Sequence, residues 1–151
     1  MKRQKKFYIT TPIYYVNDKP HVGHAYTTVI ADILTRWHKL KGEDTFYLTG
    51  LDENGQKIVS ASIKLGFNSP KKFVDYMAEE WKKTWKALNI EYTDFIRTTE
   101  ERHHKLVNEF VKRMNKQDIY KGLYNGLYCE GCEAFKTLTE LTTEGLCPDH
   151  L

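Results

Sequence analysis

Residues 7–24, FYITTPIYYVNDKPHVGH, form the stretch on which the prediction of the fold depends. An apolar, β-rich run leads into a polar turn at residues 17–20, and a segment with helical spacing then opens with His21, Val22, Gly23 and His24. A strand, a turn and a helix N-terminus in this order favour an anion-binding site, because the first amides of the helix lack partners and the helix dipole is positive there. His21 and His24 add donors that can become cationic, and Gly23 lets a ligand approach the backbone. The stretch therefore has the chemistry needed to hold a triphosphate while charge shifts during phosphoryl or nucleotidyl transfer.

The chain beyond this stretch alternates between strand and helix signals. Apolar runs predict strands at residues 7–13, 45–48 and 94–97, and helical spacing predicts helices at residues 22–41 and 56–65. Glycines at the ends of both predicted helices are typical of helix termination.

Two further helices are predicted from their N-terminal residues. Ser69 and Pro70 supply a cap and a first-turn proline for one of them, and Thr98 with Glu101 makes a capping box for the other. The apolar residues expected to face inward are Phe73, Met77, Trp81, Trp85 and Leu88 in the first helix, and Leu106, Val107, Phe110, Val111 and Met114 in the second. The full order of elements predicts an α/β fold, the first half of a doubly wound, Rossmann-type parallel sheet.

The pattern changes from Tyr120 onward. Glycines and tyrosines alternate there, and Asn125-Gly126 is a turn signal that predicts a β-hairpin. We therefore predict two domains: residues 1–117 as the first half of a nucleotide-binding catalytic domain, and residues 118–151 as a small zinc-binding β-hairpin region that connects to it.

The three cysteines and a nearby histidine have the spacing of a metal site. Cys129 and Cys132 form one short-spaced pair, and Cys147 and His150 form another, fourteen residues after the first. Two such pairs at tight turns favour a closed, tetrahedral Cys₃His site for structural Zn²⁺, which would supply much of the folding energy of so small a region. The alternatives are ordinary reduced cysteines beside a surface histidine, or a fourth ligand from elsewhere.

The composition sets the class of protein. A chain of 151 residues with 40% hydrophobic and 28% charged residues fits a soluble globular protein, and a net charge of +3 tolerates an RNA partner without requiring one. The sequence has neither a membrane-spanning run nor a signal-peptide core, so we expect no membrane partner. Three cysteines, an odd number, argue against a disulfide framework, and we expect a cytoplasmic protein.

Four motifs occur here in the same order as in one enzyme family. They are PIYYVN at residues 12–17, HVGH at 21–24, TGLDENG at 49–55, and the cysteine cluster. Through them the chain resembles the methionyl-tRNA synthetases, a branch of the class I aminoacyl-tRNA synthetases, over nearly its whole length. HVGH is similar to the HIGH signature of that class, and the Cys₃His cluster resembles the single-zinc form of the connective region in this family.

The resemblance implies a ligase that activates L-methionine with ATP and Mg²⁺, and then transfers it from methionyl adenylate to tRNA(Met). His21 and His24 would be the catalytic residues, because they would contact the phosphates and stabilise the transition state. Gly23 would lie against adenine and ribose. Asn17 and Lys19 would belong to the ATP-binding loop.

The resemblance also implies an amino-acid pocket. Asp52 would accept the α-ammonium group of methionine, while Ile13 and Tyr15 would touch its side chain and sulfur. The residues alone leave alternatives open at these positions. Tyr15 could be sheet core, Asp52 a helix cap and His21 an ordinary turn residue.

The chain departs from the family pattern in two respects. Asn54 stands where a histidine is common, and neither a KMSKS loop nor a second half of the nucleotide fold is found. We therefore expect an incomplete portion of a synthetase, from a truncation, a split gene or a remnant. It would be inactive alone and would need the remainder of the synthetase, in cis or as a second subunit.

Two other classes of protein remain open at this point. One is a non-catalytic zinc-binding module that is derived from a synthetase and binds RNA or protein. The other is a small nucleotidyltransferase, which would share the histidine chemistry but would need neither the cysteine cluster nor the PIYYVN segment.

Overall fold

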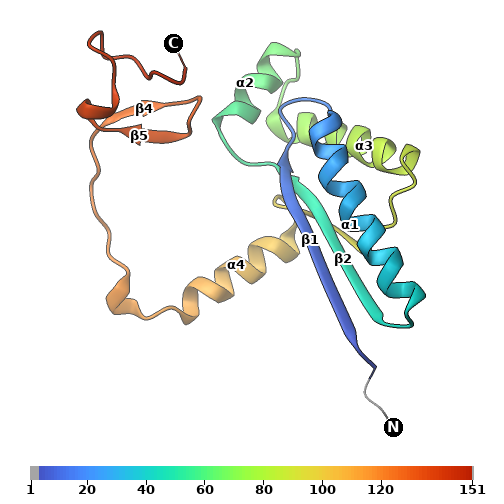
Figure 1. The fold of residues 1–151 in the computed structure, drawn as a ribbon. Coiled ribbons are helices and arrows are strands. Elements are labelled where there is room, and N and C mark those ends of the chain that lie inside the picture. The colour runs from blue at the N-terminus through green and yellow to red at the C-terminus, as the bar shows by residue number, and fades with distance from the viewer. Residues whose placement is uncertain (1–3, 151) are drawn as a thin grey trace.

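The computed structural model describes residues 4–150 and has a parallel sheet as its centre (Figure 1). The strands β1 (Lys6–Tyr15), β2 (Asp44–Asp52) and β3 (Asp94–Arg97) lie side by side in the order β1-β2-β3. The helix α1 (Val22–Leu40) connects β1 to β2, while α2 (Gln56–Lys64) and α3 (Pro70–Ala87) connect β2 to β3. This confirms the α/β prediction and the order of the elements. The strands β1 and β2 are longer than predicted and reach Tyr15 and Asp52 at their carboxyl ends.

The core lies between the sheet and two of the helices. Right-handed crossovers that advance in one direction along a sheet place their helices on the same face, so α1 and α3 cover one side. The fully or nearly fully buried side chains there are Tyr14, Val16, Tyr47, Leu51, Ile58, Phe73, Val74, Met77, Trp81 and Trp85. The predicted stripe of α3 is confirmed except for Leu88, which is the C-cap and is 43% exposed.

The face of α1 that packs on the sheet is narrower and more polar than its apolar spacing suggests. Its buried residues are Thr28, Ala31, Asp32 and Thr35, whereas Trp37 is 58% exposed. Small side chains allow the helix to approach the strands closely. Thr28 and Thr35 satisfy their hydroxyls by bonding to carbonyls one turn earlier, at 2.9 and 2.7 Å.

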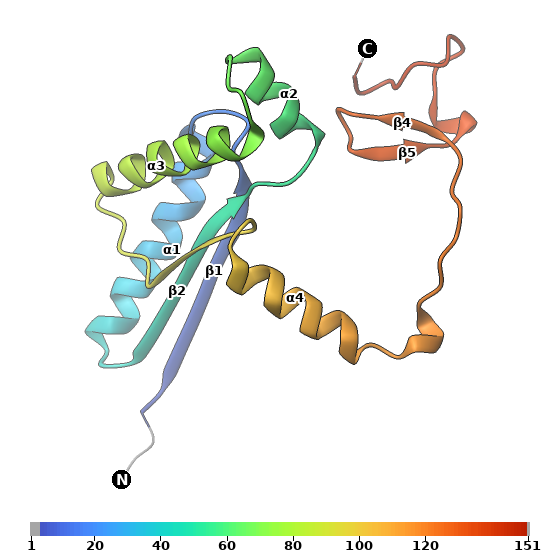
Figure 2. The same ribbon diagram turned by 180° about the vertical axis from the view of Figure 1, so that it is seen from behind.

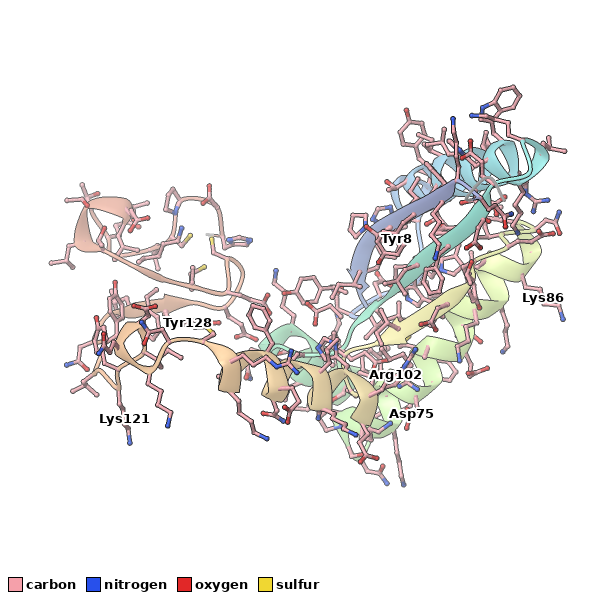
Figure 3. The ribbon with its side chains drawn as sticks, turned by 90° about the horizontal axis from the view of Figure 1, so that it is seen from below. Tyr8, Asp75, Lys86, Arg102, Lys121 and Tyr128 are labelled. Carbon is pink, nitrogen blue, oxygen red and sulfur yellow. The ribbon has the colours of Figure 1, made fainter. Side chains whose placement is uncertain are left out.

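The prediction for α4 (Glu101–Arg113) was wrong in two respects. None of its residues is buried, and Phe110 is 68% exposed, because the helix runs away from the sheet instead of packing on it (Figures 1 and 3). The N-cap is Glu100, without a side-chain cap bond, so the predicted capping box is absent. The Thr98 hydroxyl instead accepts the amide of Glu53, with 2.8 Å between the two atoms.

The last part of the described chain forms a separate small hairpin (Figure 2). A short 3₁₀ turn (Lys116–Asp118) and an extended segment lead to the antiparallel strands β4 (Leu127–Cys129) and β5 (Ala134–Lys136), and a second 3₁₀ turn follows at Leu138–Glu140. The hairpin is confirmed, but its turn is at residues 130–133 and not at Asn125-Gly126. Within residues 4–150, no helix is both long and apolar enough to span a membrane.

Candidate functional site

The two histidines of HVGH cap the N-terminus of α1 with their own side chains. His21 is the N-cap, and its Nδ1 accepts the amide of Gly23 at 3.1 Å. The Nδ1 of His24 accepts the amide of His21 at 3.2 Å, and the two rings stack with 3.6 Å between their centroids. Two of the amides that the sequence suggested as free for an anion are therefore occupied by the imidazoles. In return, each imidazole has its position fixed.

These hydrogen bonds decide which ring nitrogens can donate to a ligand. A ring nitrogen that accepts an amide hydrogen carries no proton, so the proton of each neutral imidazole lies on Nε2. Burial against Tyr14 and Trp81, together with the neighbouring His21, lowers the pKa of His24 below its ordinary value. The neutral ring with an Nε2–H donor is therefore the favoured form of His24 at neutral pH.

Gly23 leaves room for the ring that caps the helix. A Cβ at this position would lie 3.0 Å from Cε1 and 3.1 Å from Nδ1 of the His21 ring. Any side chain at residue 23 would therefore crowd the imidazole that caps the helix.

The loop at residues 17–20, before the histidines, is held by a hydrogen bond from Trp81 of α3. The carbonyl of Asp18 accepts the indole N–H of Trp81 at 3.1 Å, and the carboxylate of Asp18 accepts the amide of Lys19 at 2.7 Å. Asn17 and Lys19 are both exposed in this loop. The sequence indicated Trp81 as core, and its additional role as an anchor of the loop had no sequence signal.

The methionine-pocket residues expected from the sequence lie at the carboxyl ends of β1 and β2. Tyr15 and Asp52 are direct partners in the parallel register, and Ile13 pairs with Gly50 after an irregularity that begins at Thr10. Ile13 is 42% and Tyr15 40% exposed, while Tyr14 between them is buried, so neither predicted pocket residue is sheet core.

Asp52 is not the cap of the following helix. The N-cap of α2 is Gly55, while Oδ1 of Asp52 accepts the amide of Asn54 at 3.2 Å. A cavity of about 620 Å³ opens beside Asp52 and Asn54 and extends to His103 and Val107 of α4. The carboxylate of Asp52 thus lies at the edge of open space, but this cavity is not lined by Ile13, Tyr15, His21 or His24.

One contact at this end of the sheet was not predicted at all. The hydroxyl of Tyr15 donates to Oε2 of Glu133 at 2.7 Å, although the two residues are 118 positions apart. The pKa of Tyr15 is raised to about 12, first by this hydrogen bond and then by burial and the charge of Asp52. Glu133 follows Cys132 directly, and no sequence signal indicated that it would reach the sheet.

The four predicted metal ligands come together in the hairpin region. Ligand atoms of Cys129, Cys132, Cys147 and His150 all lie within 4.8 Å of one another. The Sγ atoms of Cys132 and Cys147 are 3.6 Å apart, and Nδ1 of His150 lies 3.3 Å from Sγ of Cys132 and 3.7 Å from Sγ of Cys129. A tetrahedron with Zn–S bonds of about 2.3 Å has edges of about 3.8 Å, so the cluster can hold a metal ion of this size.

Two thiols of the cluster differ in how readily they ionise. Burial and the neighbouring thiols raise the pKa of Cys132 to about 11, while the amide of Cys132 lowers the pKa of Cys129. A second thiolate is therefore disfavoured beside the first unless a positive ion compensates the charge.

The tight turn at Gly131 is also a requirement of the cluster. A Cβ at Gly131 would lie 2.3–2.7 Å from three atoms of the His150 ring, so the imidazole occupies the space left by the missing side chain. The glycine therefore also makes room for the fourth predicted ligand.

Comparisons with known proteins agree with this geometry. A family model described as class I tRNA synthetases (M) matches residues 7–150. The methionine–tRNA ligase of Thermotoga maritima is 51% identical over 148 residues, which is 95% of this chain and 23% of that protein. The methionine–tRNA ligase of Streptomyces coelicolor is 51% identical over 155 residues, with 97% of this chain and 29% of that protein covered.

A solved structure has the same fold over the shared region. It is the methionyl-tRNA synthetase of Mycobacterium tuberculosis in complex with methionyl-adenylate, with a TM-score of 0.85 and 35% sequence identity. The match covers 92% of this chain and 27% of that one, so this chain spans about a quarter of the length of these relatives. On the family match, the sequence identity and the fold, the chain belongs to the class I tRNA synthetases of the methionine type.

Proposed function

We propose that this chain provides the ATP- and methionine-binding part of a methionine–tRNA ligase. The observation that carries the proposal is a convergence at one edge of the sheet. The stacked pair His21 and His24 begins α1, which follows β1 after the loop at residues 16–20, and Tyr15 and Asp52 end β1 and β2 in register. In open parallel sheets, ligands bind outside the carboxyl ends of the strands, where these four side chains lie.

The first step would be adenylate formation. A carboxylate oxygen of methionine attacks the α-phosphorus of ATP, which binds as its Mg²⁺ complex, and the bond from that phosphorus to the bridging oxygen breaks to release pyrophosphate. The attacking carboxylate is already ionised, so no general base is needed. Charge grows on the phosphoryl oxygens in the transition state, and the Nε2–H groups of His21 and His24 are donors held in place for it.

The other residues would orient the two substrates. The carboxylate of Asp52 would bind the α-ammonium group of methionine, while Ile13 and Tyr15 present exposed apolar surface to its thioether side chain. Gly23 would lie against adenine and ribose, and Asn17 and Lys19 would line the phosphate loop.

The cysteine cluster would have a structural role with Zn²⁺. Three thiolates and one imidazole are the ligand set of closed zinc sites, and they leave no position for a reacting water. When bound, the ion would hold the two turns of the hairpin region together, because this region has few buried apolar side chains of its own.

Transfer to tRNA(Met) would require the remainder of a longer protein. This chain spans 23% and 29% of the two bacterial ligases. We expect the full-length gene product to catalyse methionine-dependent exchange of pyrophosphate into ATP and the isolated 151 residues to show negligible exchange, since the mobile lysines of the KMSKS loop would be missing.

The test of this function is a pair of aspartate variants in the full-length protein. Asp52→Ala should raise the KM for methionine at least about tenfold, because a charged hydrogen bond to the substrate is lost. The matched control is Asp44→Ala, because Asp44 lies at the opposite end of the same strand. This variant should change the KM for methionine by less than about twofold, which is within the error of the assay. If Asp52→Ala altered only the affinity for ATP, the assigned role would be wrong.

A non-catalytic zinc-binding module would give a different result. In that case the full-length protein would catalyse no exchange, and His24→Ala would leave nucleotide binding unchanged. Saturable ATP binding that His24→Ala abolishes would support the ligase.

A further inference from the structure

Two carboxylates of the cysteine turn reach across to the first part of the chain. Glu130, between Cys129 and Cys132, accepts the hydroxyl of Ser60 on α2, with 2.6 Å between the two oxygens. Glu133, directly after Cys132, accepts the hydroxyl of Tyr15 at 2.7 Å. The turn that would hold the metal is thus joined by one carboxylate to a helix and by the other to the pocket strand.

Tyr15 needs such a partner because packing does not fix it. Its ring is 40% exposed at the end of β1, unlike the neighbouring Tyr14, which is buried in the core. The bond to Glu133 is the single side-chain hydrogen bond that Tyr15 makes within residues 4–150. Part of the Tyr15 side chain is therefore exposed to solvent while its hydroxyl is held by Glu133.

Glu133 is itself held in a particular backbone conformation. Its φ is 51°, in the left-handed region that residues with a side chain rarely adopt, and its amide donates to the carbonyl of Glu130 to close the turn at residues 130–133. Gly55 leaves the space for its carboxylate, since a Cβ there would lie 2.5 Å from Oε1. Because residue 133 is bonded to a metal ligand, the position of its side chain depends on the conformation of the cluster.

We propose that Glu133 is a positioning residue of the methionine pocket, which holds Tyr15 in place and thereby couples the metal cluster to amino-acid binding. This inference rests on the proposed function and extends it. It gives the hairpin region a second role, because a folded cluster would be required for a well-formed pocket and not only for its own stability.

The kinetic test compares the two carboxylates of the same turn in the full-length protein loaded with zinc. Glu133→Ala should raise the KM for methionine about tenfold and leave the KM for ATP unchanged, since only the amino-acid pocket loses its support. Glu133→Gln keeps an oxygen that can accept the tyrosine hydroxyl and should recover most of the loss. The matched control Glu130→Ala removes an identical charge from the same turn and should leave the KM for methionine unchanged.

A double mutant isolates the contact itself. Tyr15→Phe should raise the KM for methionine by a similar factor, and Tyr15→Phe combined with Glu133→Ala should be no worse than the worse single variant. Multiplication of the two single effects would show that the residues act independently and would overturn the proposal.

A spectroscopic readout follows Tyr15 without reference to activity. With 3-fluorotyrosine at position 15 alone, the fluorine resonance should shift in Glu133→Ala and on removal of zinc by a chelator, but not in Glu130→Ala. Zinc content is measured in every variant. Loss of zinc in Glu133→Ala would show that the residue acts by stabilising the cluster and would overturn its assignment as a positioning residue. A resonance that is the same in all the proteins would contradict the coupling.

The outcomes separate this inference from the proposed function. A wild-type protein without methionine-dependent exchange would refute the function, while the fluorine signal would still report on the contact between Glu133 and Tyr15. A wild-type protein with full exchange and a Glu133→Ala variant with unchanged KM would refute the inference alone.

Discussion

At the scale of single residues, the stacked histidines cap their helix in a way that also decides which ring nitrogen carries the proton. His21 and His24 accept two backbone amides with their Nδ1 atoms and so keep Nε2–H for a ligand. This arrangement could be predicted only in part. The spacing indicated a helix start with two cationic donors, but the capping role of the rings depends on their rotamers, which the sequence does not state.

The first prediction concerns the titration of His24. Burial and the nearby His21 lower its pKa, so it should titrate below the ordinary value of about 6.5. The unfolded chain then binds more protons than the folded one between these two pKa values. The contribution of His24 to stability is therefore complete above about pH 6.5 and is lost as the pH falls through the folded-state pKa.

Proton NMR of the imidazole Cε1–H signals over this pH range measures the pKa directly, with assignment through His24→Gln. A value at or above about 6.5 would show that the ring is more solvated than the contacts with Tyr14 and Trp81 imply.

At the scale of elements, a buried ion pair connects the end of β2 to β3 and α3. The carboxylate of Glu53 is fully buried and accepts Nε of Arg97 at 2.6 Å, while Arg97 also donates to Asp75 of α3 at 2.6 Å. The hydroxyl of Thr99 donates to the other oxygen of Glu53. These bonds fix the strand end that carries Asp52, and Glu53 and Thr99 line the same cavity as Asp52.

The second prediction separates the breaking of this pair from its neutralisation. Arg97→Leu should lower the free energy of unfolding by about 3 kcal/mol, because it leaves the Glu53 carboxylate buried without its cation. Glu53→Gln combined with Arg97→Leu should be at least about 1 kcal/mol more stable than Arg97→Leu alone, since no uncompensated charge remains.

Urea unfolding measures both values, and Arg102→Leu is the control. Arg102 is half exposed and pairs with Asp94 and Glu100 at the surface, so its loss should cost less than about 1 kcal/mol. Equal costs for the two arginine variants would mean that Glu53 is better solvated than its burial indicates.

The helices show where reasoning from periodicity succeeds and where it stops. Phe73, Met77, Trp81 and Trp85 are buried as predicted, because α3 has the sheet beneath its apolar stripe. Leu106 and Phe110 of α4 have equally regular spacing but are exposed, and so is Trp37 of α1. Periodicity shows that a helix has an apolar face, but whether a partner covers that face depends on tertiary contacts that spacing does not encode.

At the scale of the whole molecule, the α/β part and the hairpin region are joined by an extended segment. They are also joined by side-chain contacts between residues that lie far apart in the sequence. The α/β part builds its core from large apolar side chains, whereas Cys147 is the single buried hydrophobic side chain of the described hairpin region. The metal ligands could be predicted because their spacing reports a local geometry. The contact of Glu133 with Tyr15 could not, because the local sequence pattern gave no signal that the end of a strand would meet a turn 118 residues later.

The third prediction follows from this unequal division of stability. Cys129→Ser should release the metal and unfold residues after 118, while α1 and α3 keep their structure, because the apolar core lies in the α/β part. Hydrogen exchange should show lost amide protection in β4 and β5 and unchanged protection in α3. An unchanged zinc stoichiometry would count against the assignment of this ligand.

The place of β1 in the sheet has a practical consequence. It is the longest strand, it pairs with β2 on one side, and within residues 4–150 no strand borders its other side. A row of unsatisfied backbone groups on a long, aromatic-rich strand is a template for further pairing, and Pro12 interrupts it only once. Expressed alone, these 151 residues should self-associate through the exposed edge of β1. A short extended peptide that pairs with this edge should then keep them monomeric.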